Sequence, residues 1–364
     1  MPKTITKPPQ PKYITLAETM RRQIRSGSLK PGDRLPSQAE LKARYGISQA
    51  TMERLHAHLE LDGLIVRKQG LGTFVAERPR RERTGIVGIT GLGFLKDLGS
   101  FYWTHILEGI RSEATPAELQ ILLIDTDQQS QSLSKVDGLF ITSPDEPSCV
   151  APEPGLPYVE LITALEAHDG VVADDAMGGR LLTEHLLSLG HRRIAMLTTL
   201  NYEPAERRLS GYKAALRAAG IEPDSRWVRE IGDLWPEFVD NGRLQMNKWL
   251  SEDWDELGCT AILAYNDPTA VGIIDALTDR GISVPDEVSV TGYDATGLYD
   301  YMKPLLTSVD VPLEEIGRRG MKLLLNRLNG NDGPYERIMV PVTVRPGDST
   351  APVSTVIDKL SSKS

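Results

Sequence analysis

The sequence predicts a two-domain protein, with a small N-terminal domain of short helices closed by a β-hairpin and a larger α/β domain after it. Three observations carry this prediction. A chain of 364 residues is long enough for two or three domains. Residues 1–83 hold 17 Lys and Arg against 8 Asp and Glu, a net charge of +9, whereas the remainder holds 24 against 42, a net charge of −18. The apolar pattern also changes after residue 84, from short helical repeats to buried strands that alternate with helices.

The first domain is expected to begin with two short helices. The stretch YITLAETMRRQI, from Tyr13 to Ile24, repeats apolar residues at helical spacing and leaves arginines on the other face. A second helix follows Ser37, because Glu40 three residues later completes a capping box, and Gly46 ends this helix.

A third helix is expected to start at Ser48, which is a suitable N-cap residue. Its spacing buries three apolar residues, Met52, Leu55 and Leu59. The second and third helices, joined by a tight turn at Gly46, form a helix-turn-helix.

The stretch RKQGLGTFV, residues 67–75, could be a phosphate-binding loop or the tip of a β-hairpin. A dinucleotide-binding loop lies between a strand and a helix, and a Walker loop ends in GK[ST]; neither context follows Gly72. Gly70 and Gly72 instead separate two β-like runs, LIV and TFV. We therefore expect a hairpin that forms a wing beside the helix-turn-helix.

Residues 13–76 resemble the winged-helix DNA-binding domain of GntR-family transcription regulators. The most specific pieces are PGDRLPS, GIS with Thr51 after it, and QGLGTFV. The positive charge of this part of the chain agrees with binding to double-stranded operator DNA. The resemblance implies contacts to phosphates and base edges from the following residues: Arg34, Ser37, Ser48, Gln49, Thr51, Glu53, Arg54, Arg67, Lys68, Gln69, Gly70 and Gly72.

The third helix departs from the family pattern. Many relatives carry arginine near positions 39, 49 and 53, where this chain has Ala39, Gln49 and Glu53. Gln49 can pair with adenine and Glu53 can accept a hydrogen bond from cytosine. Alternatively, Glu53 forms a pair on the helix surface with Arg54 or a nearby lysine.

From residue 85 onward, near-continuous apolar runs indicate buried strands: GIVGIT, LQILLID, DGLFITS, YVEL, GVVADD, RIAMLTT, TAILAYND and VSVTGYD. Helical stretches lie between several of them: AMGGRLLTEHLLSLG, AERRLSGYKAALRAAG and PTAVGIIDALTDRG. This alternation predicts parallel sheets covered on both faces, with ligands at the carboxyl ends of the strands.

Residues 85–350 resemble the effector-binding domain of LacI-family regulators, which has the type I periplasmic-binding-protein-like fold. The densest match is VVADDAMGGRLLTEHLLSLGHRRIAML, and RRLSGYKAALRAAGI, TAILAYNDPTAVGIIDALTDRGISVPDEVSVTGYD and PLLTSVDVPLEEIGRRGMKLLL follow in the family's order. The resemblance implies two lobes joined by crossing strands, with a small ligand between them. A GntR-type head on a LacI-type body is similar to the arabinose-repressor type of regulator.

These resemblances divide the chain into five expected segments. They are a disordered N-terminal arm (1–12), the winged helix-turn-helix (13–76), a linker (77–84), the two-lobed effector-binding domain (85–349) and a C-terminal tail (350–364). The linker is rich in arginine and proline without apolar periodicity, so its arginines are solvated or touch a minor groove.

The LacI-type resemblance implies an effector site for a sugar or sugar derivative. Arg208 of the R..GY motif, Asn266 of AYND and Asp294 of TGYD would grip vicinal hydroxyls. Without the resemblance, Arg208 is a surface helix charge and the other two are turn or cap residues. Ile162 stands where some relatives carry an aspartate that contacts sugar.

Three aromatic residues are further candidates for the effector site. In SFYWTHILEGI, Tyr102 and Trp103 match an aromatic pair ahead of the first helix of the family's fold, with core packing as the alternative. Trp235 of GDLWPE is shifted by one position from the family's usual aromatic residue.

No catalytic, metal or cofactor motif stands out. The chain lacks HExxH and GxSxG, and His185 and His191 fall where the LacI resemblance implies structural roles. Cys149 and Cys259 lack CxxC spacing, so we expect reduced thiols in the cytoplasm. No apolar run approaches the length of a membrane span.

We therefore expect a ligand-responsive transcription regulator, a repressor of carbohydrate-utilisation genes that binds operator DNA as a homodimer. The alternative is a sugar-binding sensor whose head no longer binds specific DNA. A third possibility is an enzyme fused to the same kind of head, as in the aminotransferase-like GntR members. This chain does not show the lysine motif that such an enzyme would need.

Overall fold

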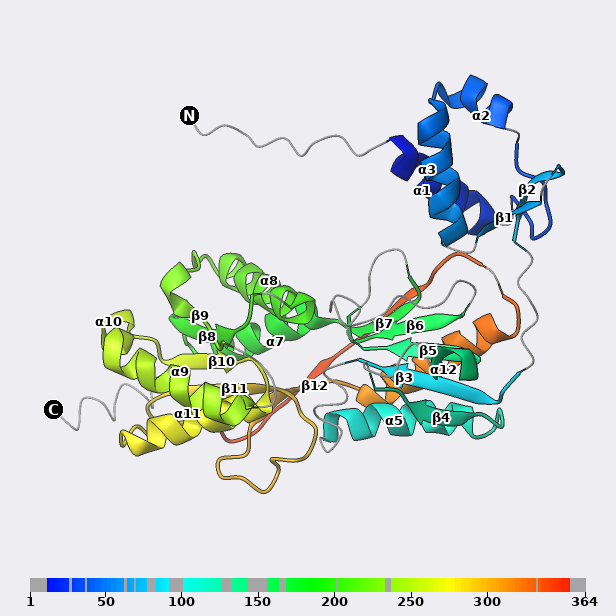
Figure 1. Ribbon diagram of the computed structural model, residues 1–364. Coiled ribbons are helices and arrows are strands. Elements are labelled where there is room, and N and C mark those ends of the chain that lie inside the picture. The colour runs from blue at the N-terminus through cyan, green and yellow to red at the C-terminus, as the bar shows by residue number, and fades with distance from the viewer. Residues whose placement is uncertain are drawn as a thin grey trace, which may run out of the picture.

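The computed structural model describes residues 12–25, 28–36, 38–61, 64–68, 70–76, 83–91, 101–125, 132–142, 156–163, 168–200, 202–232, 237–331 and 333–353. These residues form a small N-terminal unit, called the head below, and a two-lobed body (Figure 1).

The head has the predicted elements in the predicted order. It contains α1 (Lys12–Arg25), α2 (Gln38–Tyr45), α3 (Gln49–Leu61), β1 (Ile65–Lys68) and β2 (Gly72–Val75). Met52, Leu55 and Leu59 are fully buried, as expected. Each such side chain stabilises the fold by about 1.5–3 kcal/mol. Gly46 follows α2 with a φ of +60°, a conformation that favours glycine and ends the helix.

The wing is a hairpin with a third segment beside it. Ile65 pairs with Val75 in the antiparallel ladder, and Gly70 and Gly72 have φ values of +76° and +119°. Residues 32–35 of the PGDRLPS motif run along the free edge of β2, where Leu35 N donates to Thr73 O at 2.8 Å. This motif therefore holds the wing against the helices.

One buried side chain in the head has no described polar partner. His56 on α3 is 1% exposed, and neither ring nitrogen forms a hydrogen bond to the described residues. Burial lowers the pKa of His56, and the nearby Arg67 lowers it further. The imidazole is therefore held neutral in the core of the head.

Lobe 1 is built on a parallel sheet with strand order β13-β7-β6-β5-β3-β4. Its elements are β3 (Ile86–Thr90), α5 (Phe101–Ala114), β4 (Gln120–Leu123), η2 (Leu133–Lys135), β5 (Gly138–Ile141), β6 (Tyr158–Leu161), β7 (Gly170–Ala173), α12 (Leu313–Leu328) and β13 (Arg337–Val340).

Lobe 2 repeats this plan with strand order β14-β12-β11-β10-β8-β9, in which β14 alone runs antiparallel to its neighbour. Its elements are α7 (Asp175–Ser188), β8 (Ile194–Thr198), α8 (Glu203–Ala218), η3 (Ser225–Trp227), β9 (Val228–Glu230), α9 (Phe238–Glu252), α10 (Trp254–Leu257), β10 (Ala261–Ala264), α11 (Asp267–Asp279), β11 (Ser289–Asp294), β12 (Thr307–Asp310) and β14 (Thr343–Arg345).

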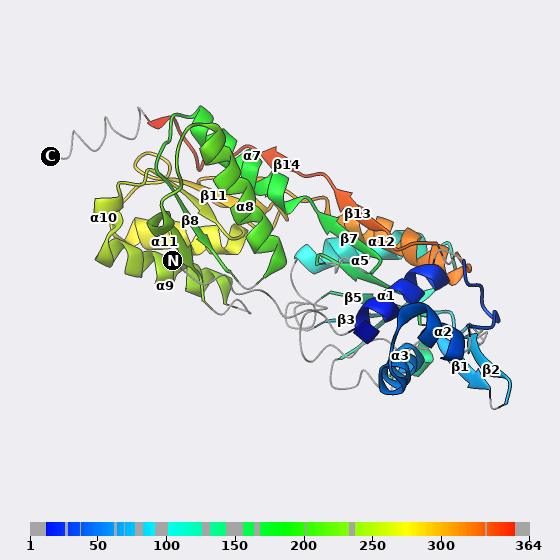
Figure 2. The same ribbon diagram turned by 90° about the horizontal axis from the view of Figure 1, so that it is seen from above.

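The eight strands and three body helices predicted from the sequence are present, and the predicted parallel sheets are confirmed apart from the antiparallel β14. In Figure 1, α7 and α8 cover one face of the lobe 2 sheet and α9 and α11 cover the other. The predicted two lobes are also joined by crossing segments. The chain crosses between β7 and α7, between β12 and α12, and between β13 and β14 (Figure 2).

Three helix pairs of the body cross at paired glycines, where a side chain would collide with the backbone of the partner helix. A Cβ on Gly211 of α8 would lie 1.9 Å from Ala176 O, and one on Gly179 of α7 would lie 2.1 Å from Arg208 O. The pairs α5–α12 and α9–α11 repeat this contact at Gly109 with Gly317 and at Gly242 with Gly272. These close approaches fix the positions of the helix N-termini that face the lobe interface.

Polar contacts also link the two lobes. Arg337 Nη2 on β13 donates to Glu203 Oε1 on α8 at 2.7 Å, and Arg207 Nε donates to the same oxygen at 2.6 Å. His105 Nε2 on α5 lies 3.2 Å from Thr296 O, in the segment after β11.

Both ends of the body are attached by hydrogen bonds. Arg83, which the sequence places in the linker, donates to Leu328 O at 3.0 Å at the C-terminal end of α12. Thr84 N donates to Asp137 Oδ1 at 2.7 Å. In the expected tail, Ala351 N donates to Ser289 Oγ at 3.0 Å, and Val353 N donates to Leu189 O at 2.9 Å.

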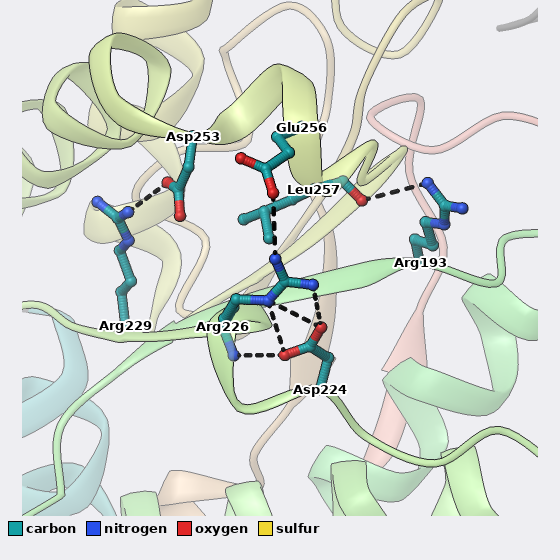
Figure 3. A network of polar contacts seen from close by, with 7 residues as sticks. All are labelled: Arg193, Asp224, Arg226, Arg229, Asp253, Glu256 and Leu257. Carbon is teal, nitrogen blue, oxygen red and sulfur yellow. Dashed lines mark hydrogen bonds and ion pairs between the residues drawn. The ribbon is translucent and has the colours of Figure 1, made fainter.

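A charged network ties together the segments at the N-terminal ends of β8 and β9 (Figure 3). Arg226 Nη2 lies 2.7 Å from Asp224 Oδ2, and Arg226 Nη1 lies 3.4 Å from Glu256 Oε1 on α10. Arg229 pairs with Asp253 ahead of the same helix. The side chains are all partly exposed, so this network connects surface segments and contributes little stability.

Candidate functional site

A cavity of about 470 Å³ lies between the lobes at the carboxyl ends of the strands. It is lined by Phe101, Tyr102, Trp103, Ile162, Tyr202, Arg208, Glu237, Phe238, Val239, Asp240, Tyr265, Asn266, Asp267, Pro268, Asp294, Thr296, Leu298 and Tyr299. A more open hollow beside it shares Asp294 and Thr296. The three polar residues predicted from the sequence, Arg208, Asn266 and Asp294, are thus brought together.

Arg208 is the centre of the cavity's polar wall. Its Nε donates to Asp175 Oδ1 at 2.8 Å, and its Nη1 donates to Tyr265 O at 2.8 Å. The guanidinium Cζ lies 3.5 Å from the ring centroid of Tyr293. Arg208 is 7% exposed, so it is held by the fold before any ligand arrives.

Sequence reasoning missed Asp175, the main partner of Arg208. The signal was present in the doubled aspartate of VVADDAMGG. Asp174 Oδ1 accepts a hydrogen bond from Met177 N and caps α7, which leaves Asp175 in the first turn, buried and facing α8. The contact depends on the glycine-mediated crossing of α7 and α8, which the local sequence does not reveal.

Asp294 presents an acceptor that the described residues leave unused. Its Oδ1 lies 3.8 Å from Arg208 Nη2 and accepts no hydrogen bond from the described part of the chain. Burial raises the pKa of Asp294 to about 6, against the lowering effect of the Arg208 charge. A ligand hydroxyl that donated to this oxygen would remove the cost of leaving it unpaired.

The backbone is strained on both sides of the cavity. Asp294 has a φ of +96° and Ala295 a φ of +46°, while Ile162 in lobe 1 has a φ of +77°. Positive φ is rare for non-glycine residues, and rarest for β-branched ones such as isoleucine. Strain of this kind clusters at ligand sites, where the surrounding structure maintains it.

Asn266 combines a structural role with its place in the cavity wall. Its Oδ1 accepts from Thr269 N at 3.0 Å and from Thr269 Oγ1 at 2.7 Å, which caps α11. Asn266 is therefore both the N-cap of α11 and part of the cavity wall. Beside it, Asp267 Oδ1 accepts from Ser308 Oγ at 2.5 Å, and burial raises the pKa of Asp267 to about 7.

Tyr102 and Trp103, the predicted aromatic pair, both line the cavity. They lie within the first turn of α5 and not ahead of the helix, and Trp103 is 2% exposed and also packs in the lobe 1 core. Its spacing with Ile106 and Ile110 explains why it packs inward. Trp235 lies outside the described residues. Aromatic side chains that the sequence did not single out also line the cavity: Phe101, Tyr202, Phe238, Tyr265 and Tyr299.

The predicted DNA-contacting residues on α3 lie mostly on its exposed surface. Ser48 Oγ accepts from Thr51 N at 3.2 Å, which confirms the predicted N-cap. Gln49 Nε2 donates to Glu53 Oε1 at 3.0 Å, so Glu53 has a different partner from the Arg54 or lysine suggested above. Arg54 is exposed.

The wing presents the remaining candidates. Arg67 is exposed and its Nε lies 3.0 Å from Glu60 Oε1, while the ammonium group of Lys68 lies 5.2 Å from the ring centroid of Phe74. Arg34 packs beside Gly72, where an added Cβ would meet Arg34 Nε at 3.0 Å. Gly70 is exposed, and Ser37 and Gln69 lie outside the described residues.

Two family models match parts of the chain. Residues 12–75 match the family described as bacterial regulatory proteins, gntR family. Residues 183–350 match the periplasmic binding protein-like domain.

Two curated relatives are transcriptional repressors. The chain is 27% identical over 343 residues to the arabinose metabolism transcriptional repressor of Geobacillus stearothermophilus, which covers 87% of this chain and 91% of the relative. It is 29% identical over 266 residues to the ribose operon repressor of Escherichia coli strain K12, which covers 68% of this chain and 78% of the relative.

Two solved structures with a similar fold contain sugars. The transcriptional regulator CelR–cellobiose complex is 26% identical with a TM-score of 0.68, over 83% of this chain and 91% of that one. A LacI family transcriptional regulator from Enterococcus faecium with bound ribose is 27% identical with a TM-score of 0.63, over 73% of this chain and 99% of that one. The present chain therefore joins a winged-helix domain that matches the gntR family to a domain that matches the periplasmic binding protein-like family, an arrangement similar to the arabinose metabolism transcriptional repressor.

Proposed function

We propose that this protein represses carbohydrate-utilisation genes in the cytoplasm and that a small sugar-like effector between the lobes controls its binding to operator DNA. The observation that carries this proposal is the polar wall of the cavity. Arg208 and Asn266 are fixed by the fold, and Asp294 Oδ1 has no described hydrogen-bond donor. A fixed acceptor between aromatic side chains suits a ligand with hydroxyl groups on its edge and C–H groups on its faces.

Effector binding would act on the equilibrium between lobe arrangements. The cavity takes residues from both lobes, so a ligand that bridges Tyr102 and Asp294 favours the closed arrangement. A coupling of about 1–3 kcal/mol between effector and operator is typical of such regulators. A binding role of this kind requires no catalytic chemistry.

We propose that the protein acts as a homodimer. One helix-turn-helix reads one half-site, so an operator with two-fold symmetry requires two heads. Light scattering on the full chain tests this part of the proposal, and a monomer at micromolar concentration would contradict it.

Fluorescence anisotropy with the DNA upstream of the protein's own gene tests the regulator proposal. We expect sequence-specific binding, with an affinity that changes by about 5- to 150-fold when the effector is added. L-Arabinose, D-ribose and cellobiose are the first probes, since the relatives' names point to these sugars. Random DNA of equal length is the control.

The second candidate, a sugar sensor without specific DNA binding, is favoured by one observation. Glu53 places an exposed carboxylate on α3, the helix that would enter the major groove. If the protein binds sugar but binds every DNA fragment equally weakly, the sensor proposal is correct and the repressor proposal is wrong.

A further inference from the structure

The charges around the cavity are strongly unbalanced. Among the described residues that line it, Arg208 is the sole cation, whereas Glu237, Asp240, Asp267 and Asp294 are acidic. Asp175 adds a further carboxylate directly behind Arg208, at 2.8 Å from its Nε. The described wall therefore carries more negative than positive charge.

The charge of Arg208 is already neutralised by the protein. Two of its nitrogens donate to Asp175 and to the carbonyl oxygen of Tyr265, and a third lies 3.8 Å from Asp294. The face of the guanidinium is covered by the Tyr293 ring. An anion that approached Arg208 would also approach Asp294, whose free oxygen accepts hydrogen bonds and repels negative charge.

The three helix N-termini that lobe 2 presents to the cavity also disfavour an anion, whereas the first turn of α5 in lobe 1, which lines the cavity too, carries no acidic residue. The N-cap residues of α8, α9 and α11 are Tyr202, Glu237 and Asn266, and all three line the cavity. Free helix N-termini attract phosphate and carboxylate groups. Each of these three carries its own acidic residue in the first turn: Glu203 and Glu206 on α8, Asp240 on α9 and Asp267 on α11.

We infer that the cavity selects an uncharged polyhydroxylated ligand and excludes phosphorylated and carboxylated sugars. This inference rests on the proposed function, because it specifies the chemical class of the effector at the same site. Discrimination comes from a repulsive element, the excess of carboxylates, as well as from attractive contacts to hydroxyl groups. Like charges brought together at a binding interface cost enough to weaken binding at least about 100-fold.

Isothermal titration of the full-length protein with matched pairs tests the inference. The pairs are D-ribose with D-ribose 5-phosphate, D-arabinose with D-arabinose 5-phosphate, and D-glucose with D-glucuronate; L-arabinose and cellobiose extend the uncharged set. We expect at least one uncharged sugar to bind, and every anionic compound to bind at least about 100-fold more weakly than that sugar. An anionic compound that binds equally well or better overturns the inference and leaves the repressor proposal intact. Binding of none of these compounds would count against the sugar effector itself, and against this inference with it.

A charge-neutralised variant sharpens the test. Glu237→Gln combined with Asp240→Asn removes two acidic groups from the α9 side of the cavity and preserves side-chain size. We expect the ratio of uncharged to anionic affinity to fall by about 3- to 10-fold, because the repulsion is weaker. Glu222→Gln is the matched control, since Glu222 is exposed on lobe 2 and does not line the cavity. An unchanged ratio in the double variant, or an equal fall in the control, would contradict the electrostatic origin.

Discussion

The two surfaces that carry the proposed function are built in opposite ways. In the cavity, Arg208, Asn266 and Asp294 are buried or nearly so, and Arg208 and Asn266 are bound to other parts of the protein. On the head, Gln49, Glu53 and Arg54 are exposed on one helix, and the described contact of Glu53 is local, to Gln49 one turn away.

Because of this difference, the cavity residues contribute to both stability and ligand recognition, whereas the exposed head residues contribute to recognition only. Groups in the cavity lose their hydration when the protein folds, so their partners must offset that cost before any effector binds. Exposed groups on the head keep their water until DNA displaces it. Substitutions in the cavity should therefore change both folding and binding, whereas those of exposed residues on the head should change binding alone.

The largest effect is expected from Arg208→Ala. It leaves Asp175 and Asp294 buried without their cation, which should lower the free energy of unfolding by about 3–5 kcal/mol and abolish effector binding. All five tryptophans lie after residue 84, so tryptophan fluorescence during urea unfolding reports on the body. Arg217→Ala, at an exposed position on the same helix, is the control and should cost under about 1 kcal/mol. Equal losses of unfolding free energy in the two variants would contradict the claim that Arg208 stabilises the fold by neutralising Asp175 and Asp294.

Asp294→Asn should separate stability from binding by moving them in opposite directions. Burial raises the pKa of Asp294 to about 6, above that of an unfolded aspartate, so the native protein loses stability as pH rises through about 4 to 6. Asparagine does not ionise, so the variant does not lose stability in this way. We expect the ligand-free variant to be more stable than the wild type by about 2 kcal/mol at pH 8, with a difference that shrinks as pH falls to 4. Effector affinity should fall, because Asn has one acceptor in place of the carboxylate. Urea unfolding at several pH values measures the difference; a constant gap would contradict the ionisation account.

His56→Leu offers the same kind of test in the core of the head, but here the stability of the wild type falls as pH is lowered. Burial lowers the pKa of His56, so the unfolded chain takes up a proton that the native head does not. The stability of the wild-type head is fully present above about pH 6.5 and is lost as pH falls below it. His56→Leu should remove this loss and stabilise the head by about 1–2 kcal/mol, since neither ring nitrogen has a described partner. Hydrogen exchange of the α3 amides at pH 7 and pH 5 measures the effect; an equal pH response in the two proteins would contradict it.

On the exposed surface of the head, Glu53→Ala should leave the stability of the protein unchanged. If Glu53 reads a base, the variant binds random DNA more tightly and loses about 1 kcal/mol of preference at one base pair, at the lower end of the range for such contacts. We expect the lower end because Gln49 already engages the carboxylate. Selection of sites from a random DNA pool decides the question, and identical motifs from wild type and variant would exclude base reading.

The smallest effect is expected from Lys68→Ala in the wing. Lys68 is exposed and positioned over Phe74, so its charge is available to a phosphate. We expect all DNA sequences to bind more weakly by under about 1 kcal/mol, and the slope of log affinity against log salt to flatten by about one. Lys213→Ala on lobe 2 is the control, and a slope equal to that of the wild type would remove Lys68 from the interface.

The sequence predicted best those features that depend on neighbouring residues. Buried strands such as β3 (Ile86–Thr90) and β10 (Ala261–Ala264) are nearly continuous apolar runs, and their hydrophobicity alone marks them. The caps at Ser48 and Gly46 were also visible, because a cap requires a few particular residue types at fixed offsets. The strands that were missed, β9, β12, β13 and β14, are three or four residues long, and β9 and β14 contain no buried residue.

The cavity was harder to predict because its members come from different segments. Asp175 reaches Arg208 across a helix crossing, and Tyr202 and Phe238 enter the cavity from separate helix starts. None of these residues has a periodic neighbour that would mark it. The family resemblance supplied Arg208, Asn266 and Asp294, whereas the Asp175 partner of Arg208 depends on the packing of α7 against α8.

Helix α12 connects two distant places in the body. It begins at Leu313, directly after the chain crosses from lobe 2, and its sixteen residues extend about 24 Å. At the other end, Leu328 O accepts the hydrogen bond from Arg83, the first described residue after the arginine-rich segment that leads from the head. Arg83 is thus held at the end of α12 that lies farthest from the crossing between the lobes. A change in lobe arrangement of the kind proposed above would move this attachment point together with α12, and would need no contact between effector and head.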